Sequence, residues 1–250
     1  MIAALWAEAV KLASSLAGKV ATAAIVGGVI ALSCVILAAV DSGNVDVISK
    51  LGPGASSDWT GFLRSSAQIT AAGGLGGFGI ILAWMFGREF TENTVSNLFG
   101  LPVGRATIAL SKLVTYAIWS VLVSLVLSLG LLVSGLIAGL GDVTGEVTLG
   151  LLRQTALAVM TAVLALPIAW IATLARSVLG GVGATAGLIV IGQFSVLAGA
   201  GAWMPLAAPA LWGLSGGSGA TPLQLGMLIP YAAVSVALTA LAWKRLELDR

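Results

Sequence analysis

Five charged residues fall within one polar segment, residues 88–112, which separates two long uncharged runs. Its acids are Glu89 and Glu92, and its bases are Arg88, Arg105 and Lys112. Fixed charges of both signs can recognise a complementary protein surface. Because lipid excludes charged side chains, such a segment between two membrane spans must face water or another protein. We therefore interpret it as a docking element rather than a plain connector.

The spacing within this segment predicts a short amphipathic helix. Glu89, Glu92 and Ser96 recur on one face, whereas apolar residues occupy another. Gly100 and Pro102 follow as residues that end a helix. The alternative is a helix that lies passively among lipid headgroups. We favour docking because an acidic face points away from anionic lipid.

The residue types that catalytic and metal sites need are scarce. The chain has no His, which excludes His-containing nucleophilic triads and zinc motifs, and its one cysteine, Cys34, falls inside an apolar run. Residues 13–20, ASSLAGKV, approach the phosphate-binding pattern G-x-x-x-x-G-K-[ST], but Ala13 and Val20 replace its first Gly and its final Ser or Thr. We therefore expect no enzymatic activity, metal or cofactor on this chain, and a net charge of +2 is too small to indicate nucleic acid.

Composition predicts that membrane helices position these polar residues. The chain is 58% hydrophobic and only 9% charged, with a mean hydropathy of +1.06. A charge near the middle of a span costs roughly 2.5–3.5 kcal/mol, so uncharged runs of about 20 residues mark the spans. The last run, Ser177–Trp243, is long enough for two spans and is interrupted by Pro205, Pro209 and Pro222. We predict an all-α polytopic membrane protein, a single domain over residues 1–250, with six spans at about 20–40, 65–87, 113–140, 154–175, 179–200 and 223–243.

The distribution of basic residues orients these spans, because Lys and Arg accumulate in cytoplasmic loops. With both termini inside, the inner set is Lys11, Lys19, Arg88, Arg105, Lys112, Arg176, Lys244, Arg245 and Arg250. The outer set is then Lys50, Arg64 and Arg153. We therefore expect a multi-pass protein of the cell membrane with both termini in the cytoplasm.

Three further features surround the spans. Residues 1–18 have apolar residues at helical spacing, with Glu8 and Lys11 on the other face, and predict an interfacial helix. Residues 201–222 are apolar but broken by Pro and Gly, which predicts an outer re-entrant or interfacial segment. Glycines such as Gly73 and Gly77 indicate close helix packing, with a moving gate as the alternative. Pro167 should kink the fourth span.

The segment that follows the second span resembles a known signature, R-E-x-x-x-x-T-x-x-x-L-x-x-x-P-V-x-R followed by a Lys. The chain supplies Arg88, Glu89, Thr94, Leu98, Pro102, Val103, Arg105 and Lys112. It departs from the signature at Asn93 and Gly104, where Gly and Ser are usual. The stretch from Glu8 to Leu12 is similar to the Glu-x-x-Lys-Leu of an interfacial helix. In these motifs and in layout the chain resembles the permease subunits of type-2 ABC transporters, the ABC exporter family.

The resemblance implies that residues 88–105 are a coupling segment and Glu89–Phe99 a coupling helix, seated in a groove of a separate ATP-binding subunit. Two permeases, identical or closely related, and two ATPases would form the transporter, with ATP and Mg²⁺ bound by the ATPases. The docking residues that it implies are Arg88, Glu89, Glu92, Thr94, Leu98, Phe99, Pro102 and Arg105. It also implies that the segment 201–222 caps the exit of the transport path. We further predict that Glu89→Lys leaves folding intact but uncouples ATP hydrolysis from transport.

The spans themselves indicate the kind of cargo. They carry almost no charge and only scattered polar residues, such as Gln68, Thr70, Gln193 and Ser195, which suit a hydrophobic or amphipathic substrate such as a drug, antibiotic or peptide. The alternatives are a stand-alone secondary transporter or channel, which would need buried ionisable residues, and a membrane scaffold or sensor that does not transport. A membrane-embedded enzyme is the last alternative.

Overall fold

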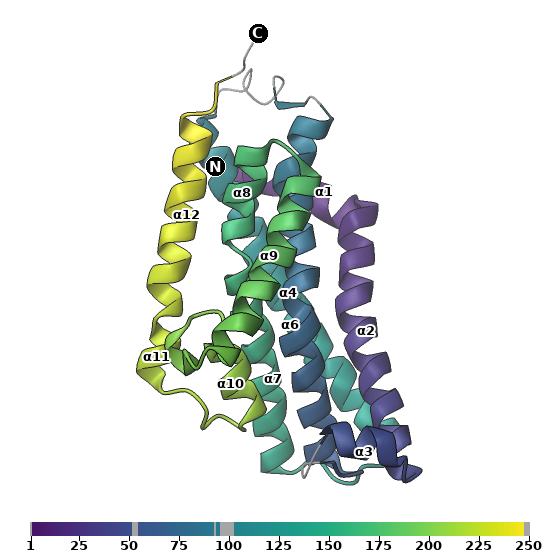
Figure 1. The fold of residues 1–250 in the computed structure, drawn as a ribbon. Helices are drawn as coiled ribbons and strands as arrows, with labels where there is room; N and C mark the ends of the chain where they lie inside the picture. Colours follow the sequence, from purple (N-terminus) through teal and green to yellow (C-terminus); the bar gives the residue numbers. More distant parts are fainter. Residues whose placement is uncertain (1, 52–54, 93, 96–102, 248–250) are drawn as a thin grey trace.

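The computed structural model describes residues 2–51, 55–92, 94–95 and 103–247. These residues form a bundle of helices, and six helical segments are long and apolar enough to cross a membrane (Figure 1). The expected class, an all-α polytopic membrane protein with six spans, is therefore confirmed.

The first half of the chain contains α1 (Ile2–Ser14), α2 (Leu16–Asp41), α3 (Val45–Leu51), α4 (Trp59–Thr91) and α6 (Arg105–Ile137). The second half contains α7 (Gly145–Leu164), α8 (Pro167–Ala175), α9 (Val178–Leu197), the 3-10 turn η2 (Gly201–Trp203), α10 (Ala208–Leu214), α11 (Pro222–Gly226) and α12 (Leu228–Lys244). The six spanning segments are α2, α4, α6, α7 with α8, α9, and α11 with α12. Both ends of the described chain lie at one end of the bundle, and α3 lies at the other (Figure 1).

Helix α4 lies at the centre of the bundle and packs against α2, α7, α8 and α9. Phe78, Ile81 and Phe86 of this helix are fully buried, as expected for a helix that is apolar on most sides. A Cβ at Gly77 would lie 2.6 Å from Ile25 of α2, so the glycine allows α2 to approach closely. The packing interpretation is confirmed there, whereas Gly73 has no neighbour that its Cβ would meet.

The central helices extend beyond the predicted spans. Helix α4 begins at Trp59 rather than near residue 65, and Asp58 caps it by accepting a hydrogen bond from the Gly61 amide. Its other end reaches Thr91 and includes Glu89. The predicted second span stops at the first charged residue on each side. A helix can nevertheless continue past such a residue, because its end turns accommodate charges that are paired or that reach water.

Two predicted irregularities have clear structural counterparts. The fourth span is divided, because α7 ends at Leu164 and α8 begins at Pro167, where proline cannot donate a helical hydrogen bond. The broken segment 201–222 folds into η2, α10 and the start of α11, and α10 packs against α4 and α7.

The first helix differs from its expected orientation. A Cβ at Gly18 would lie 2.2 Å from the Leu12 carbonyl oxygen, so only glycine permits this tight turn from α1 into α2. The turn holds α1 against α6, with Glu8 buried and Trp6 exposed. The expectation that Glu8 lies on a water-facing side of α1 was therefore wrong, because its carboxylate has partners inside the bundle.

Candidate functional site

A cluster of four charged side chains joins α1, α4 and α6 at the end of the bundle that holds the termini. Lys112 Nζ donates to Glu8 Oε2 and to Glu89 Oε1, both at 2.8 Å. Lys11 Nζ lies 3.0 Å from Glu8 Oε1 and 3.3 Å from Glu89 Oε1. Each cation therefore bridges both carboxylates, and we call these residues the inner ion cluster.

The inner ion cluster is almost closed to solvent. The side chain of Lys112 is 1% exposed, and those of Glu89 and Glu8 are 3% and 7% exposed, whereas Lys11 is 37% exposed at the edge. Its two acids and two bases balance, which is the condition under which charges can be buried. Removing one partner from such an arrangement typically costs about 3–5 kcal/mol, because another charge remains buried without compensation.

Lys11 shows how the cluster holds its charges. Partial burial disfavours its ammonium form, but the carboxylates of Glu8 and Glu89 outweigh this effect, so the pKa of Lys11 is raised. The ammonium is therefore retained at all physiological pH values. The cluster clamps three helices together.

Of the predicted docking residues, the exposed Glu92 and the partly buried Arg88 lie next to the inner ion cluster. Arg88 forms an ion pair of 3.0 Å with Glu92, and its guanidinium lies 4.5 Å from the ring centre of Trp84. The Glu92 side chain is 49% exposed. These two residues are therefore available to a partner at the point where α4 ends.

Other predicted docking residues are engaged within the chain. Glu89 lies on the last turns of α4 and is buried in the inner ion cluster, and Thr94 donates from its hydroxyl to the Glu89 carboxylate. Arg105 begins α6 and donates to the Leu246 carbonyl oxygen near the C-terminus. Leu98, Phe99 and Pro102 lie outside the described residues, as does most of the expected coupling helix. The docking role of all eight residues stays a prediction.

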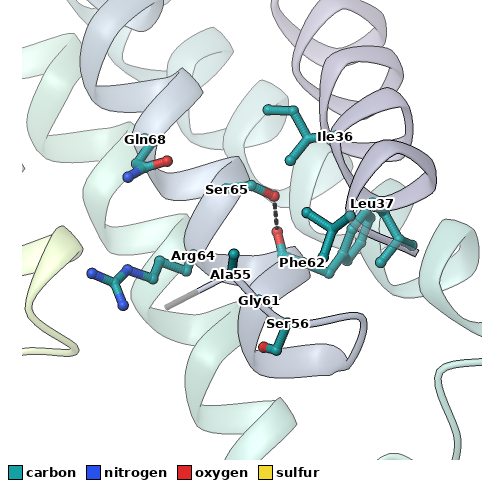
Figure 2. Close-up of a pocket in the computed structure, with 10 residues that line it drawn as sticks. Ile36, Leu37, Ala55, Ser56, Gly61, Phe62, Arg64, Ser65 and Gln68 are labelled. Carbon is teal, nitrogen blue, oxygen red and sulfur yellow. Dashed lines mark hydrogen bonds between the residues drawn. The ribbon is translucent and has the colours of Figure 1, made fainter. Parts of the chain in front are cut away.

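The structure does not bring the four predicted pathway residues together. Thr70 is buried and accepts a 2.7 Å hydrogen bond from Gln154 of α7, whereas Gln193 and Ser195 lie near the end of α9, with Gln193 exposed. Gln68 lines a small pocket between α2 and α4 (Figure 2), whose volume of about 10 Å³ admits one water at most. Their role in a pathway stays a prediction.

A much larger cavity opens at the opposite end of the bundle, between α4, α7 and α10. Its volume is about 810 Å³, and Trp59, Arg64, Arg153 and Gln154 are among its lining residues. We call it the outer cavity. It is large enough for a drug-sized molecule, whose sites usually measure about 300–1,000 Å³.

Sequence reasoning missed both the inner ion cluster and the outer cavity. For the cluster, a signal was present: two acids and two bases flank apolar runs at the same predicted membrane face, so they can neutralise one another. For the cavity, the adjacent polar pair Arg153 and Gln154 at the start of an otherwise apolar span was the available signal. Neither signal identifies partners that lie far apart in the sequence.

Comparison with known proteins fits this architecture. Residues 5–193, most of the chain, match the family model described as ABC-2 family transporter protein. The bacitracin transport permease protein BCRB of Bacillus licheniformis is 43% identical over 42 residues, which cover 17% of this chain and 20% of that relative. The similarity thus spans only a fifth of the relative's length. On the extent of the family match, the chain belongs to the ABC-2 transporter family and is a membrane subunit of an ABC transporter.

Proposed function

We propose that this chain is the permease of an ATP-driven exporter that moves hydrophobic or amphipathic substrates out of the cytoplasm. A separate ATP-binding subunit, in two copies, docks at the bundle end that carries the inner ion cluster and binds ATP and Mg²⁺. A second permease, identical or closely related, completes the transporter. The protein resides in the cell membrane, with both termini in the cytoplasm.

The observation that carries this proposal is the way the inner ion cluster links the docking segment to the spans. Glu89 belongs to α4 just before the segment leaves the helix, and Lys112 lies on α6 just after the segment returns. Glu8 connects both to α1. A movement imposed on the segment therefore acts on three helices as one body, which supports a role in coupling.

Charge distribution supports the cytoplasmic placement of this end. Lys11, Arg88, Lys112 and Arg176 lie at the bundle end that holds the termini, where Arg176 also donates to the Glu247 carbonyl oxygen at 3.0 Å. The opposite end carries Lys50, Arg64 and Arg153. An excess of Lys and Arg marks the cytoplasmic side.

The apolar surface of the spans supports a hydrophobic or amphipathic substrate. Ile118, Leu122 and Leu129 of α6 are each more than half exposed on the described chain, so this face contacts lipid, another subunit or a lipophilic molecule.

The experiment is to purify the tagged chain from its native membrane and identify associated proteins. The proposal predicts a co-purifying subunit that carries G-x-x-x-x-G-K-[ST]. Purified complex is then reconstituted in vesicles with ATP on the outside, and a panel of lipophilic drugs is compared with sodium for stimulation of ATP hydrolysis.

In vesicles whose ATPases face outward, the outside corresponds to the cytoplasm. Stimulation of ATP hydrolysis by the drug, together with ATP-dependent accumulation of the drug inside these vesicles, would therefore support export. Stimulation by sodium alone would reject the proposed substrate class, and ATP-dependent loss of drug from the vesicles would reject the direction. Vesicles supplied with a non-hydrolysable ATP analogue are the control for passive partitioning.

A further inference from the structure

We infer that the outer cavity is a binding site for an amphipathic anion that carries a hydrogen-bond donor beside its charge, as in an N-acyl amino acid. Residues Arg64 and Arg153 bind the anionic group, Gln154 accepts the neighbouring hydrogen bond, and the apolar walls hold the chain. This binding does not depend on the proposed direction of transport or on the ATP-binding partner.

The two guanidinium groups come from facing helices. Arg64 lies on α4 and Arg153 on α7, and both line the outer cavity. Within the described residues neither forms an ion pair or hydrogen bond with another side chain. Figure 2 shows that the Arg64 side chain extends away from the α2 side of its helix. Paired guanidinium donors suit carboxylate and phosphate oxygens.

Three acids line the outer cavity: Asp58 before α4, Asp142 in the loop between α6 and α7, and Glu146 at the start of α7. Asp58 Oδ1 accepts from the Gly61 amide and from the Ser56 hydroxyl. Glu146 lies in the first turn of α7, where the helix dipole favours a negative charge. Arg153 follows about two turns further along α7, so the positive charge lies deeper than the acids.

The loop after α10 brings backbone against Arg153. A Cβ at Gly217 would lie 3.4 Å from Arg153 Nε, and both Gly216 and Gly217 adopt positive φ angles, which favour glycine. Gly213, Ser215 and Gly216 line the cavity. The two glycines therefore let the loop approach the Arg153 guanidinium closely at the edge of the cavity.

Gln154 supplies an unsatisfied acceptor next to this charge. Its residue is 2% exposed and lines the outer cavity, and its Nε2 donates to Thr70 at 2.7 Å. Its Oε1 is buried without a hydrogen-bond partner in the described part of the chain. Buried acceptors are nearly always satisfied, so an N–H or hydroxyl donor from the occupant accounts for this one.

The apolar lining completes the site. Leu63, Ala67, Leu149 and Leu157 line the same cavity. An acyl chain buried there gains free energy from leaving water, and the two arginines select the charge of its head group. A cationic amphiphile would meet the same apolar walls, but its charge would lie beside the two arginines.

The test uses the full chain in dodecyl maltoside, with N-dodecanoylglycine as the probe and native mass spectrometry to count bound molecules. We expect saturable binding by the wild-type protein and at least roughly tenfold weaker binding by the Arg64→Gln/Arg153→Gln variant, since it loses two charged hydrogen-bond donors. Lys50→Gln, which removes an outer cation that does not line the cavity, is the matched control and should bind normally. If the double variant folds poorly, the single variant Arg153→Lys takes its place. It keeps the positive charge and should retain part of the wild-type affinity.

Ligand pairs test each group separately. In N-dodecanoylsarcosine a methyl group replaces the amide hydrogen, so this ligand should bind more weakly than N-dodecanoylglycine to the wild type, but equally to Gln154→Met. Dodecyltrimethylammonium tests the charge. Normal binding of the probe by the double variant, or equally tight binding of the cation, would overturn the inference.

Membrane lipid is the other source of such chemistry, since phosphatidic acid also carries an anion with a hydroxyl group. In nanodiscs of phosphatidylcholine, displacement of the probe by added phosphatidic acid identifies a lipid occupant. Persistence of the probe identifies a free amphiphile. Both results support the site, whereas absence of saturable probe binding in detergent and in nanodiscs rejects it.

Discussion

Lys112 and Glu8 are separated by 104 positions in the chain, yet their side chains meet at 2.8 Å inside the bundle. This ion pair connects the N-terminal helix to the start of the third span. Since Lys112 also contacts Glu89, one ammonium group holds the ends of three helices. The cohesion of the proposed docking end depends on this group.

Replacing Lys112 by Met should therefore destabilise the protein strongly. The change leaves Glu8 and Glu89 buried with only Lys11 between them, and we expect a loss of about 3–5 kcal/mol in the free energy of unfolding. Thermal unfolding in detergent measures the effect. Lys19→Met, at an exposed lysine near the same end, is the control and should change stability little.

The Glu8→Met/Lys112→Met double variant separates charge from packing. It removes one acid and one base and leaves the Lys11–Glu89 pair intact. If an uncompensated buried charge causes the destabilisation by Lys112→Met, the double variant should be more stable than Lys112→Met alone. Equal or lower stability would show that packing, rather than charge balance, dominates at this position.

Glu89→Lys and Glu92→Lys should have different consequences although the residues are one helical turn apart. Glu89 is buried among two ammonium groups, so a third cation there should lower folding stability, contrary to the expectation from sequence that folding stays intact. Glu92 is half exposed, so its replacement should preserve thermal stability and weaken co-purification of the ATP-binding subunit. Normal co-purification with Glu92→Lys would remove Glu92 from the docking surface.

Gly18→Ala tests the tight turn between α1 and α2. The new Cβ would collide with the Leu12 carbonyl oxygen, and we expect a cost of roughly 1–3 kcal/mol. Gly27→Ala, in the same helix but with no neighbour within 4 Å, should leave the melting temperature unchanged or slightly higher. Similar melting temperatures for the two variants would contradict the described turn.

Asp58 should make the start of α4 sensitive to acid. The Gly61 amide, followed by the Ser56 hydroxyl, stabilises its carboxylate and lowers the pKa of Asp58 below its ordinary value. A lowered pKa means that its stabilising effect is complete above the unfolded-state pKa, about 3.9, and is lost as pH falls through the folded-state pKa. Asp58→Ala should cost about 1 kcal/mol at neutral pH, as expected for a helix N-cap.

The melting temperatures of wild type and Asp58→Ala should converge as the pH is lowered from about 5 to about 2. Asp58→Asn keeps a capping oxygen without a titrating carboxyl, so its stability relative to Asp58→Ala should change little over this interval. A constant difference between wild type and Asp58→Ala across the same interval would argue against the cap.

The number of spans could be predicted from sequence because exclusion of charge from lipid is a local property of each run. The same rule does not give the helix ends: the predicted second span stops before Glu89, whereas α4 continues to Thr91. The rule treats each charge as isolated, whereas Glu89 is neutralised by lysines from two other helices. The kink at Pro167 was predictable because proline acts through its own backbone.

For the candidate sites, composition identified the polar segment but not its partners. Periodicity assigned Glu8 to water, because a helix considered alone shows which residues share a face but not what that face contacts. The outer cavity needed α10 to fold back against α4 and α7, which no local pattern specifies.

By itself, the sequence determined that this is a helical membrane protein with six spans and a polar segment after the second, since transfer of apolar and charged groups between water and lipid acts on each stretch independently. Only the tertiary structure decided that Glu8, Lys11, Glu89 and Lys112 form one neutral cluster, and that Arg64 and Arg153 line a cavity with no side-chain partner among the described residues. Pairing depends on which helices lie side by side, and packing between distant segments sets those neighbours.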